Sequence, residues 1–178
     1  MKNSLLIIVA IVLGSVSTFG QGDSTTGPSA KVNPGEPTPK PFVRERFDPT
    51  RDPKIDLQKA VEQAAKDSKR IILDVGGEWC GWCVYMDKFI VQNPELAKIR
   101  DDNFVWVKVN YSPANENPTF LSPYPKPAGF PHLYVLDEKG KLLYSEDTSL
   151  LEKGEEYDLA KFTKFLKTWS PKKVLAVH

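Results

Sequence analysis

The residues best suited to chemistry in this 178-residue chain are its only two cysteines, Cys80 and Cys83, which stand three positions apart. Residues 71–75 before them are apolar at nearly every position, which predicts a buried strand, and the apolar spacing from Val84 to Ile90 predicts a helix after them. Unpaired N–H groups and a partial positive charge at a helix N-terminus stabilise a nearby thiolate, which is the species that attacks disulfides. The Cys-x-x-Cys spacing at this junction therefore predicts a redox-active pair.

Two other interpretations of the cysteine pair stand beside the redox one. The cysteines could be ordinary buried thiols, or they could form half of a structural zinc site. A structural zinc site needs four protein ligands, usually with further cysteines or histidines at similar spacing. The chain has no third or fourth cysteine, which argues against zinc and leaves the redox pair as the favoured interpretation.

Three segments, in order along the chain, resemble motifs of the thioredoxin family. Residues Leu73–Cys83 look like the thioredoxin active-site segment, including an aspartate, Asp74, six positions before the first cysteine. Residues Val107–Asn110 are similar to the central-strand segment of thioredoxins. Residues Gly129–Pro131, followed by the apolar Leu133–Leu136, look like the cis-proline loop and the strand after it.

This resemblance covers about residues 54–170 and implies a thioredoxin-like three-layer α/β fold, with a central mixed sheet flanked by helices. Two features depart from the family pattern. The proline-rich stretch Ser112–Ala128 has no close counterpart in the minimal fold. Trp82 stands where thioredoxin has proline and keeps a backbone N–H, which we expect to point at the Cys80 sulfur and to make the couple less reducing than thioredoxin.

The resemblance also implies roles for the residues around the pair. Cys80 would attack the substrate disulfide, and Cys83, one turn into the helix, would resolve the mixed disulfide. Asp74 would lie beneath the pair, and a buried carboxylate has a raised pKa that lets it take the proton of Cys83. Lys108 resembles the lysine that pairs with this carboxylate, although a solvent-facing strand lysine is the competing interpretation. We therefore predict a thiol–disulfide oxidoreductase that needs no cofactor.

Four residues are predicted to bind substrate. Pro131, as a cis-proline, would present a backbone edge to an extended polypeptide. Trp79, Trp82 and Phe130 would offer an apolar rim to unfolded or extended thiol proteins, although each of the three could instead belong to the core.

A metal-binding alternative rests on His132, the residue after the proline. With Cys80 and Cys83 it would make a site of two sulfurs and one nitrogen, which suits a soft metal such as Cu(I). That arrangement would describe a copper-binding module or metallochaperone. The competing interpretation makes His132 an ordinary strand residue.

The hydrophobic pattern predicts helices alternating with strands, followed by a late antiparallel hairpin, which fits a mixed three-layer sheet. We expect Asp56 to cap the first helix, Asn93 the helix that begins with Pro94, and Asp158 the last one. The predicted helices begin near residues 56, 81, 93 and 158, and the predicted strands are 71–75, 104–109, 132–136 and 141–145.

The N-terminal segment, residues 1–20, has a basic residue, an apolar run and a small-residue end, as a secretory signal peptide does. The apolar run is shorter than the about 20 residues of a membrane span, although an uncleaved anchor is an alternative. We therefore expect a secreted or periplasmic protein that is not stably inserted in the membrane after cleavage.

The stretch 21–53 is rich in proline and small residues, and we interpret it as a linker before the domain at 54–170. Its composition predicts that residues 21–50 are dispensable for chemistry. The boundary is soft, because Phe42, Phe47 and nearby arginines could pack onto the domain edge. Residues 171–178 are predicted to be a C-terminal tail.

Charge says little about a specific partner. Without residues 1–20 the chain would carry 23 basic and 23 acidic residues, and no dense basic tract suggests nucleic-acid binding. The expected partners are protein thiols or disulfides and a redox partner that the sequence does not identify, with the protein itself a monomer.

Overall fold

The computed structural model describes residues 44–172. The predicted signal peptide, the linker up to residue 43 and the tail from residue 173 onward lie outside the described residues. The elements, in chain order, are α1 Pro53–Asp67, β1 Arg70–Gly76, α2 Gly81–Gln92, α3 Pro94–Asn103, β2 Phe104–Asn110, α4 Pro118–Leu121, β3 His132–Leu136, β4 Leu142–Asp147, a 3-10 turn Thr148–Leu151, β5 Glu152–Lys153, β6 Glu156–Tyr157 and α5 Leu159–Trp169.

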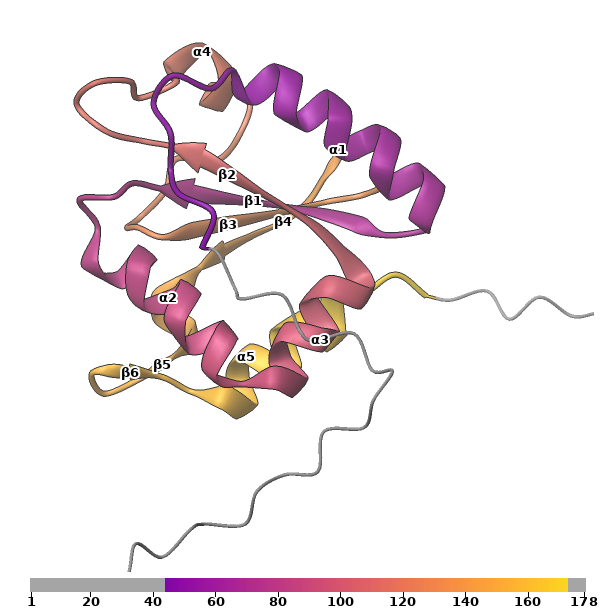
Figure 1. The fold of residues 1–178 in the computed structure, drawn as a ribbon, viewed down its shortest axis with the longest axis vertical. Coiled ribbons are helices and arrows are strands. Elements are labelled where there is room, and N and C mark those ends of the chain that lie inside the picture. The colour runs from indigo at the N-terminus through magenta and orange to yellow at the C-terminus, as the bar shows by residue number, and fades with distance from the viewer. Residues whose placement is uncertain (1–43, 173–178) are drawn as a thin grey trace, which may run out of the picture. The chain divides into compact units, whose positions relative to one another are not determined.

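Four strands form the central sheet in the order β2-β1-β3-β4. Strand β1 pairs in parallel with β2 and antiparallel with β3, and β3 pairs antiparallel with β4, so the sheet is mixed. Helices α1 and α4 cover one face of the sheet, and α2, α3 and α5 cover the other (Figure 1). Because side chains alternate along a strand, β1 supplies both layers. Ile71, Leu73 and Val75 pack towards α1, and Ile72 joins the core on the α2 side.

The first helix begins earlier than the sequence pattern suggested. Asp52, not Asp56, is the N-cap of α1, and its side chain accepts a hydrogen bond from the Lys54 backbone N–H at 2.8 Å. Proline is favoured at the first helical position, so Pro53 decides between the two aspartates. Asp56 lies in the first turn and accepts a hydrogen bond from Arg51 Nε at 2.8 Å.

Two other elements differ in detail from the prediction. Asn93 does occupy the N-cap position of α3, but its side-chain amide donates to the Phe89 carbonyl at 2.7 Å instead of capping the helix. Strand β4 runs two residues further than the predicted 141–145. The proline-rich stretch Ser112–Ala128 contains the short helix α4, whose Phe120 is buried in the core on the α1 side.

A row of polar side chains crosses the sheet on the face that α2 covers. Asp74 of β1 is aligned with Lys108 of β2 on one side and with Leu133 of β3 on the other. Leu133 is aligned in turn with Glu146 of β4. Directly paired residues point to the same face of a sheet, so Lys108, Asp74 and Glu146 all lie on the face that α2, α3 and α5 cover, with Leu133 between the two carboxylates.

Glu146 is a buried carboxyl group, only 6% exposed. Burial, with a smaller contribution from Asp147, raises the pKa of Glu146 from 4.5 to about 7. The contribution of protonated Glu146 to the free energy of unfolding is therefore fully present below pH 4.5 and is lost as the pH rises through about 7. Glu146→Gln removes this loss, so the variant should be more stable than the wild type at pH 8 by on the order of 2 to 3 kcal/mol, with a much smaller difference near pH 4.5.

Urea unfolding of both proteins at pH 4.5 and pH 8 measures this difference. Glu138→Gln, at an exposed position of the β3–β4 turn, is the control for removal of a surface carboxylate. A stability difference between Glu146→Gln and wild type that is the same at both pH values would contradict the prediction.

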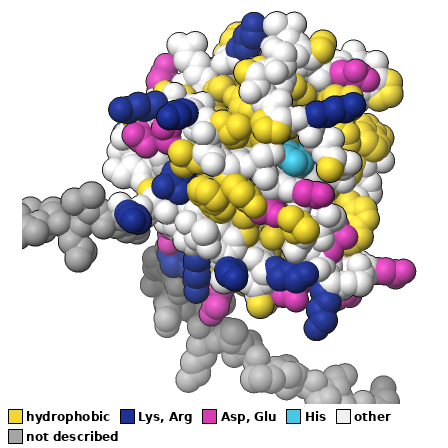
Figure 2. Space-filling model, turned by 180° about the vertical axis from the view of Figure 1, so that it is seen from behind, with side chains coloured by type: hydrophobic (Ala, Val, Ile, Leu, Met, Phe, Trp, Pro, Cys, Tyr) yellow, Lys and Arg dark blue, Asp and Glu magenta, His cyan; other side chains and the backbone are white. Residues whose placement is uncertain are grey.

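The outer surface of the domain mixes charged and apolar side chains. Figure 2 shows apolar side chains gathered across one face, with basic and acidic side chains around them. Among residues 44–172, the large apolar residues that are most exposed are Ile55, Trp79, Leu143, Tyr144, Leu150 and Leu159. Within residues 44–172, none of the helices has the length and apolar character needed to cross a membrane.

Candidate active site

The two cysteines form a disulfide at the start of α2, with their Cα atoms 5.2 Å apart. Cys80 is the N-cap of α2, and its sulfur accepts a hydrogen bond from the Cys83 backbone N–H at 3.1 Å. Cys80 is 6% exposed and Cys83 is fully buried, so the more accessible sulfur is the predicted attacking one. We had expected the Trp82 backbone N–H to reach the Cys80 sulfur, but the N–H that does so belongs to Cys83. The Trp82 N–H therefore gives no support to the expectation of a couple less reducing than thioredoxin.

The two glycines between β1 and α2 make room for the disulfide. A Cβ atom on Gly76 would lie 2.5 Å from the Cys83 sulfur, and one on Gly77 would lie 2.4 Å from the Trp79 indole nitrogen. Real Cβ contacts are not this short, so any larger residue at either position would displace the sulfur or the indole. The Gly-Gly pair thus allows the strand to pass directly beneath the redox pair.

Asp74 is fully buried on β1, two residues before Gly76 on the same face of the sheet. Its Oδ2 accepts hydrogen bonds from Lys108 Nζ at 2.8 Å and from the Trp106 indole N–H at 3.0 Å. Its Oδ1 has no hydrogen-bond partner among residues 44–172. Burial is the main cause that raises the pKa of Asp74, although Lys108 opposes it. In this environment Asp74 holds a proton more readily than an exposed aspartate does.

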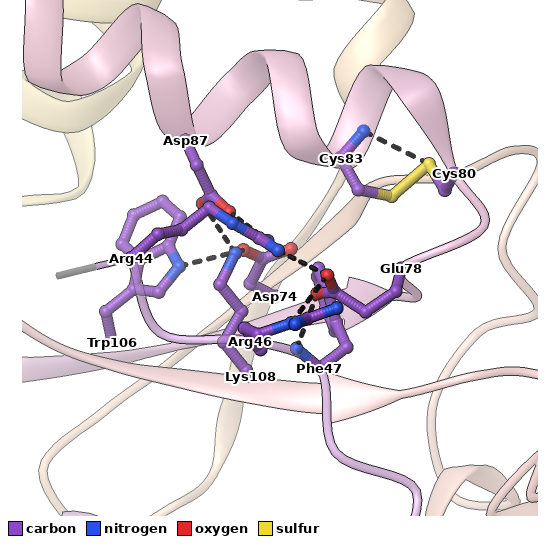
Figure 3. A network of polar contacts seen from close by, with 10 residues as sticks. All are labelled: Arg44, Arg46, Phe47, Asp74, Glu78, Cys80, Cys83, Asp87, Trp106 and Lys108. Carbon is purple, nitrogen blue, oxygen red and sulfur yellow. Dashed lines mark hydrogen bonds and ion pairs between the residues drawn. A yellow bond between two sulfur atoms is a disulfide. The ribbon is translucent and has the colours of Figure 1, made fainter.

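Lys108 is buried rather than solvent-facing, so the pairing implied by the thioredoxin resemblance is the correct alternative. Its ammonium also donates to Oδ1 of Asp87, a residue of α2, at 2.5 Å. Burial alone would lower the pKa of Lys108, but Asp74 and Asp87 together outweigh it and raise that pKa. One ammonium therefore bridges two buried carboxylates, one from the sheet and one from the helix (Figure 3).

Residues Arg44–Phe47, which we call the strap, precede α1 in the chain and contact both this ion-paired group and the cysteine pair. Arg44 pairs with Asp87 Oδ2 at 3.0 Å and also with Glu78, two residues before the first cysteine. The Phe47 side chain is 3% exposed and lies in one apolar cluster with both cysteines. Its ring centroid is 4.3 Å from the Lys108 ammonium nitrogen.

These contacts change the expectation for the linker. Residues 44–50 were predicted to be dispensable, but the strap packs on the redox pair and its buried ion pairs, so we no longer expect dispensability for these residues. The packing of Phe47 on the domain is the alternative that the soft boundary had left open, and its side chain is buried. The domain boundary at residue 54 stays a prediction.

The predicted substrate-binding residues surround the disulfide unevenly. Trp79 is 57% exposed, and its ring meets the ring of Phe130 edge-on at 5.8 Å between centroids. Phe130 packs against the cysteine cluster and precedes a cis peptide bond to Pro131, which is the isomer expected from the resemblance. Trp82 also touches the cysteine cluster, but its ring packs inward on Tyr157 at 5.3 Å. Binding of substrate by these residues stays a prediction.

The residues of the copper alternative are not arranged as a metal site. His132 is buried on β3, where its Nε2 is 2.8 Å from the Ser145 hydroxyl oxygen and burial lowers its pKa. Among the described residues, no group of three or more His, Cys, Asp or Glu side chains could hold a metal ion. His132 is therefore a strand residue, as the competing interpretation had it.

Two residues of the site, Glu78 and Asp87, were missed in the sequence, and Phe47 was expected only to pack at the domain edge. A signal existed for Asp87, because it follows Cys83 by four positions and so lies on the same face of the helix. Glu78 stands in the loop before the cysteines, and Phe47 is 31 positions away from it. No periodicity in the sequence connects those two residues.

A mixed sheet between helices, with a Cys-x-x-Cys disulfide where a helix begins, defines the thioredoxin class of fold, and comparisons with known proteins agree. A family model described as thioredoxin-like matches residues 52–138. The disulfide bond reductase DsbH of Chlamydia pneumoniae is 32% identical over 92 residues, which cover 47% of this chain and 55% of that protein. Spermatogenesis-associated protein 20 of Homo sapiens is 40% identical over 53 residues, 30% of this chain and 7% of that protein.

Among solved structures, the disulphide isomerase from Xylella fastidiosa Temecula1 has a TM-score of 0.61 at 21% identity, over 71% of this chain and 98% of that one. The predicted resemblance to thioredoxin-like proteins is confirmed, and so is the α/β fold with a central mixed sheet flanked by helices. The matched regions span about half of DsbH and a small part of the human protein.

Proposed function

We propose that this protein is a thiol–disulfide oxidoreductase that exchanges disulfides with protein substrates through Cys80 and Cys83. The observation that carries this proposal is the disulfide between them at the N-terminus of α2, on the same side of the sheet as the buried carboxyl of Asp74. The family match and the similarity to a disulfide bond reductase also support it.

The reaction proceeds in two exchanges. In the reduced protein, the Cys80 thiolate attacks a substrate disulfide, forms a mixed disulfide and releases one substrate thiolate. Cys83 then loses its proton to the Asp74 carboxylate, and its thiolate attacks the Cys80 sulfur. The Cys80–Cys83 bond forms, the bond to the substrate breaks, and the departing thiolate takes a proton from solvent. Two electrons pass to the substrate, and the same steps in reverse oxidise a substrate dithiol.

Each group in the site has a task in these steps. The N-terminus of α2 stabilises the Cys80 thiolate, because its unpaired N–H groups and partial positive charge face the first sulfur. Asp74 can hold the proton because it is buried, and Lys108 keeps its ionised form from being left as an isolated buried charge. Phe130, Trp79 and Pro131 contact the substrate polypeptide next to its disulfide.

We also propose that the protein works outside the cytosol and receives or delivers electrons through a separate redox partner. The secretory pattern of residues 1–20 supports the location. The use of both cysteines in one exchange-competent pair supports action on other proteins rather than self-stabilisation.

The proposal is tested by the reduction of insulin disulfides in the presence of dithiothreitol, followed as turbidity of the released chain. Wild-type protein at micromolar concentration should shorten the lag before precipitation several-fold. A double variant, Cys80→Ser with Cys83→Ser, is the matched control and should leave the lag at its uncatalysed length. Equal lags for the two proteins would overturn the proposal.

A further inference from the structure

We propose that Phe47, held in place by Glu78, is a positioning residue that keeps water from Asp74 and Lys108 and thereby sets the pH range in which Cys83 resolves a mixed disulfide. This inference rests on the proposed function and adds a part to the same site. The added part is the strap, which is separate in the sequence from the Cys-x-x-Cys segment.

The Phe47 ring separates the sulfurs from the buried charges. One side of the ring meets the cysteine pair, and a Cβ atom on Gly76 would lie 3.2 Å from the ring tip and 2.5 Å from the Cys83 sulfur. The Lys108 ammonium lies over the ring face, 4.3 Å from its centroid. Phe47 is only 3% exposed, so its ring is itself shielded from solvent and covers the Lys108 ammonium on this side.

Glu78 holds the strap in this position. Its Oε1 accepts a hydrogen bond from the Phe47 backbone N–H at 2.9 Å, and its Oε2 accepts one from Arg46 Nε at 3.1 Å. Arg44 donates to the same Oε2 and, through its other terminal nitrogen, to Asp87 at 3.0 Å. Three donors from four consecutive residues thus converge on one carboxylate (Figure 3). Charge-assisted hydrogen bonds of this kind are the stronger ones, so the strap is fastened rather than merely adjacent.

The charged groups around Asp74 come from several elements. Lys108 of β2 donates to it, and Asp87 of α2 shares that ammonium. Tyr157 of β6 lies near enough for Asp74 to raise the pKa of its phenol, although burial is the larger cause of that shift. Glu146 of β4 lies in the same cross-sheet row, beyond Leu133. None of these side chains takes the place of the Phe47 ring between Lys108 and the sulfurs.

The consequence for the chemistry follows from the cost of burying a carboxylate. Burial is the main cause that raises the pKa of Asp74, with Asp87 adding to it and Lys108 opposing it. Admitting water lowers that cost, so the carboxylate ionises at lower pH and becomes a weaker base. Without the ring, Cys83 should therefore resolve with a pH midpoint about one unit or more lower and with a slower plateau.

The test uses the full chain and a chromogenic aromatic disulfide, 5,5′-dithiobis(2-nitrobenzoate), in stopped flow. Attack by Cys80 on the reagent releases the first thionitrobenzoate in a concentration-dependent phase. Resolution by Cys83 releases the second in a concentration-independent phase, whose rate is followed against pH. Phe47→Ala should lower the midpoint of the second phase, and Phe47→Leu, which keeps an apolar cover, should retain the wild-type midpoint.

Two further variants separate this effect from loss of stability. Phe165→Ala makes a cavity of the same kind in α5, where Phe165 is 6% exposed, and should leave the midpoint unchanged. Glu78→Gln weakens the contacts that hold the strap but leaves the Phe47 ring in the chain, and it should also lower the pH midpoint of the second phase. This variant provides the test if Phe47→Ala does not fold. A folded Phe47→Ala or Glu78→Gln protein with the wild-type midpoint would overturn the inference. Absence of any second phase in the wild type would instead overturn the proposed function.

Discussion

Cys83→Ser is expected to trap a mixed disulfide between Cys80 and its protein substrate, whereas Cys80→Ser should trap none. Cys80 caps α2 and is the more exposed residue of the pair, while Cys83 is fully buried and bonded to the Cys80 sulfur. Without Cys83 the attack still occurs but the intermediate cannot be resolved, and without Cys80 the attack itself is lost, so turnover in both single variants should fall to the level of the double variant.

The trapped species are measured on non-reducing gels after exposure to oxidised insulin or to extracytosolic proteins. The double variant with both serines shows the background. Trapping by the two single variants to the same extent would show that the assignment of the two sulfurs is wrong, because either cysteine could then begin the reaction.

Asp74→Asn is expected to slow the resolving step by about 10²-fold or more, because a positioned general base contributes about 10² to 10⁴ in rate. Asparagine keeps the shape of the side chain but cannot take a proton from Cys83. The first phase of thionitrobenzoate release should keep its wild-type rate, because the N-terminus of α2 and not Asp74 stabilises the Cys80 thiolate. The second phase should also lose the part of its pH dependence that follows the raised pKa of Asp74.

The control for this variant is Asp87→Asn, which takes the other carboxylate from Lys108 without removing the group assigned as the base. It should slow resolution far less, by under about tenfold. If the two variants slowed the second phase equally, or if Asp74→Asn slowed both phases alike, the loss would come from the disturbed ion pair. Asp74 would then have a structural role only.

The local part of this protein can be predicted from its sequence. The apolar run of residues 71–75, the glycines after it and the helical spacing from Val84 to Ile90 fix a strand, a tight junction and a helix, so they also fix where the cysteines stand. Helix and strand periodicities are properties of short windows, and the chain itself displays them. Asp74 could be singled out because it stands six positions before the first cysteine, as the resemblance to thioredoxins implies.

Only the tertiary structure decided which distant groups share the site. In the sequence, a solvent-facing strand position for Lys108 is nearly as good an interpretation as the ion pair, and the register of β1 and β2 places it against Asp74. Phe47 lies in a stretch whose composition resembles a linker, yet its ring packs on the cysteines, and Arg44 reaches Asp87 across 43 positions. Such contacts depend on where the chain returns in space, and burial of a few large side chains determines that path. The charges around the redox pair are therefore set by packing over the whole domain, which no local pattern of residues encodes.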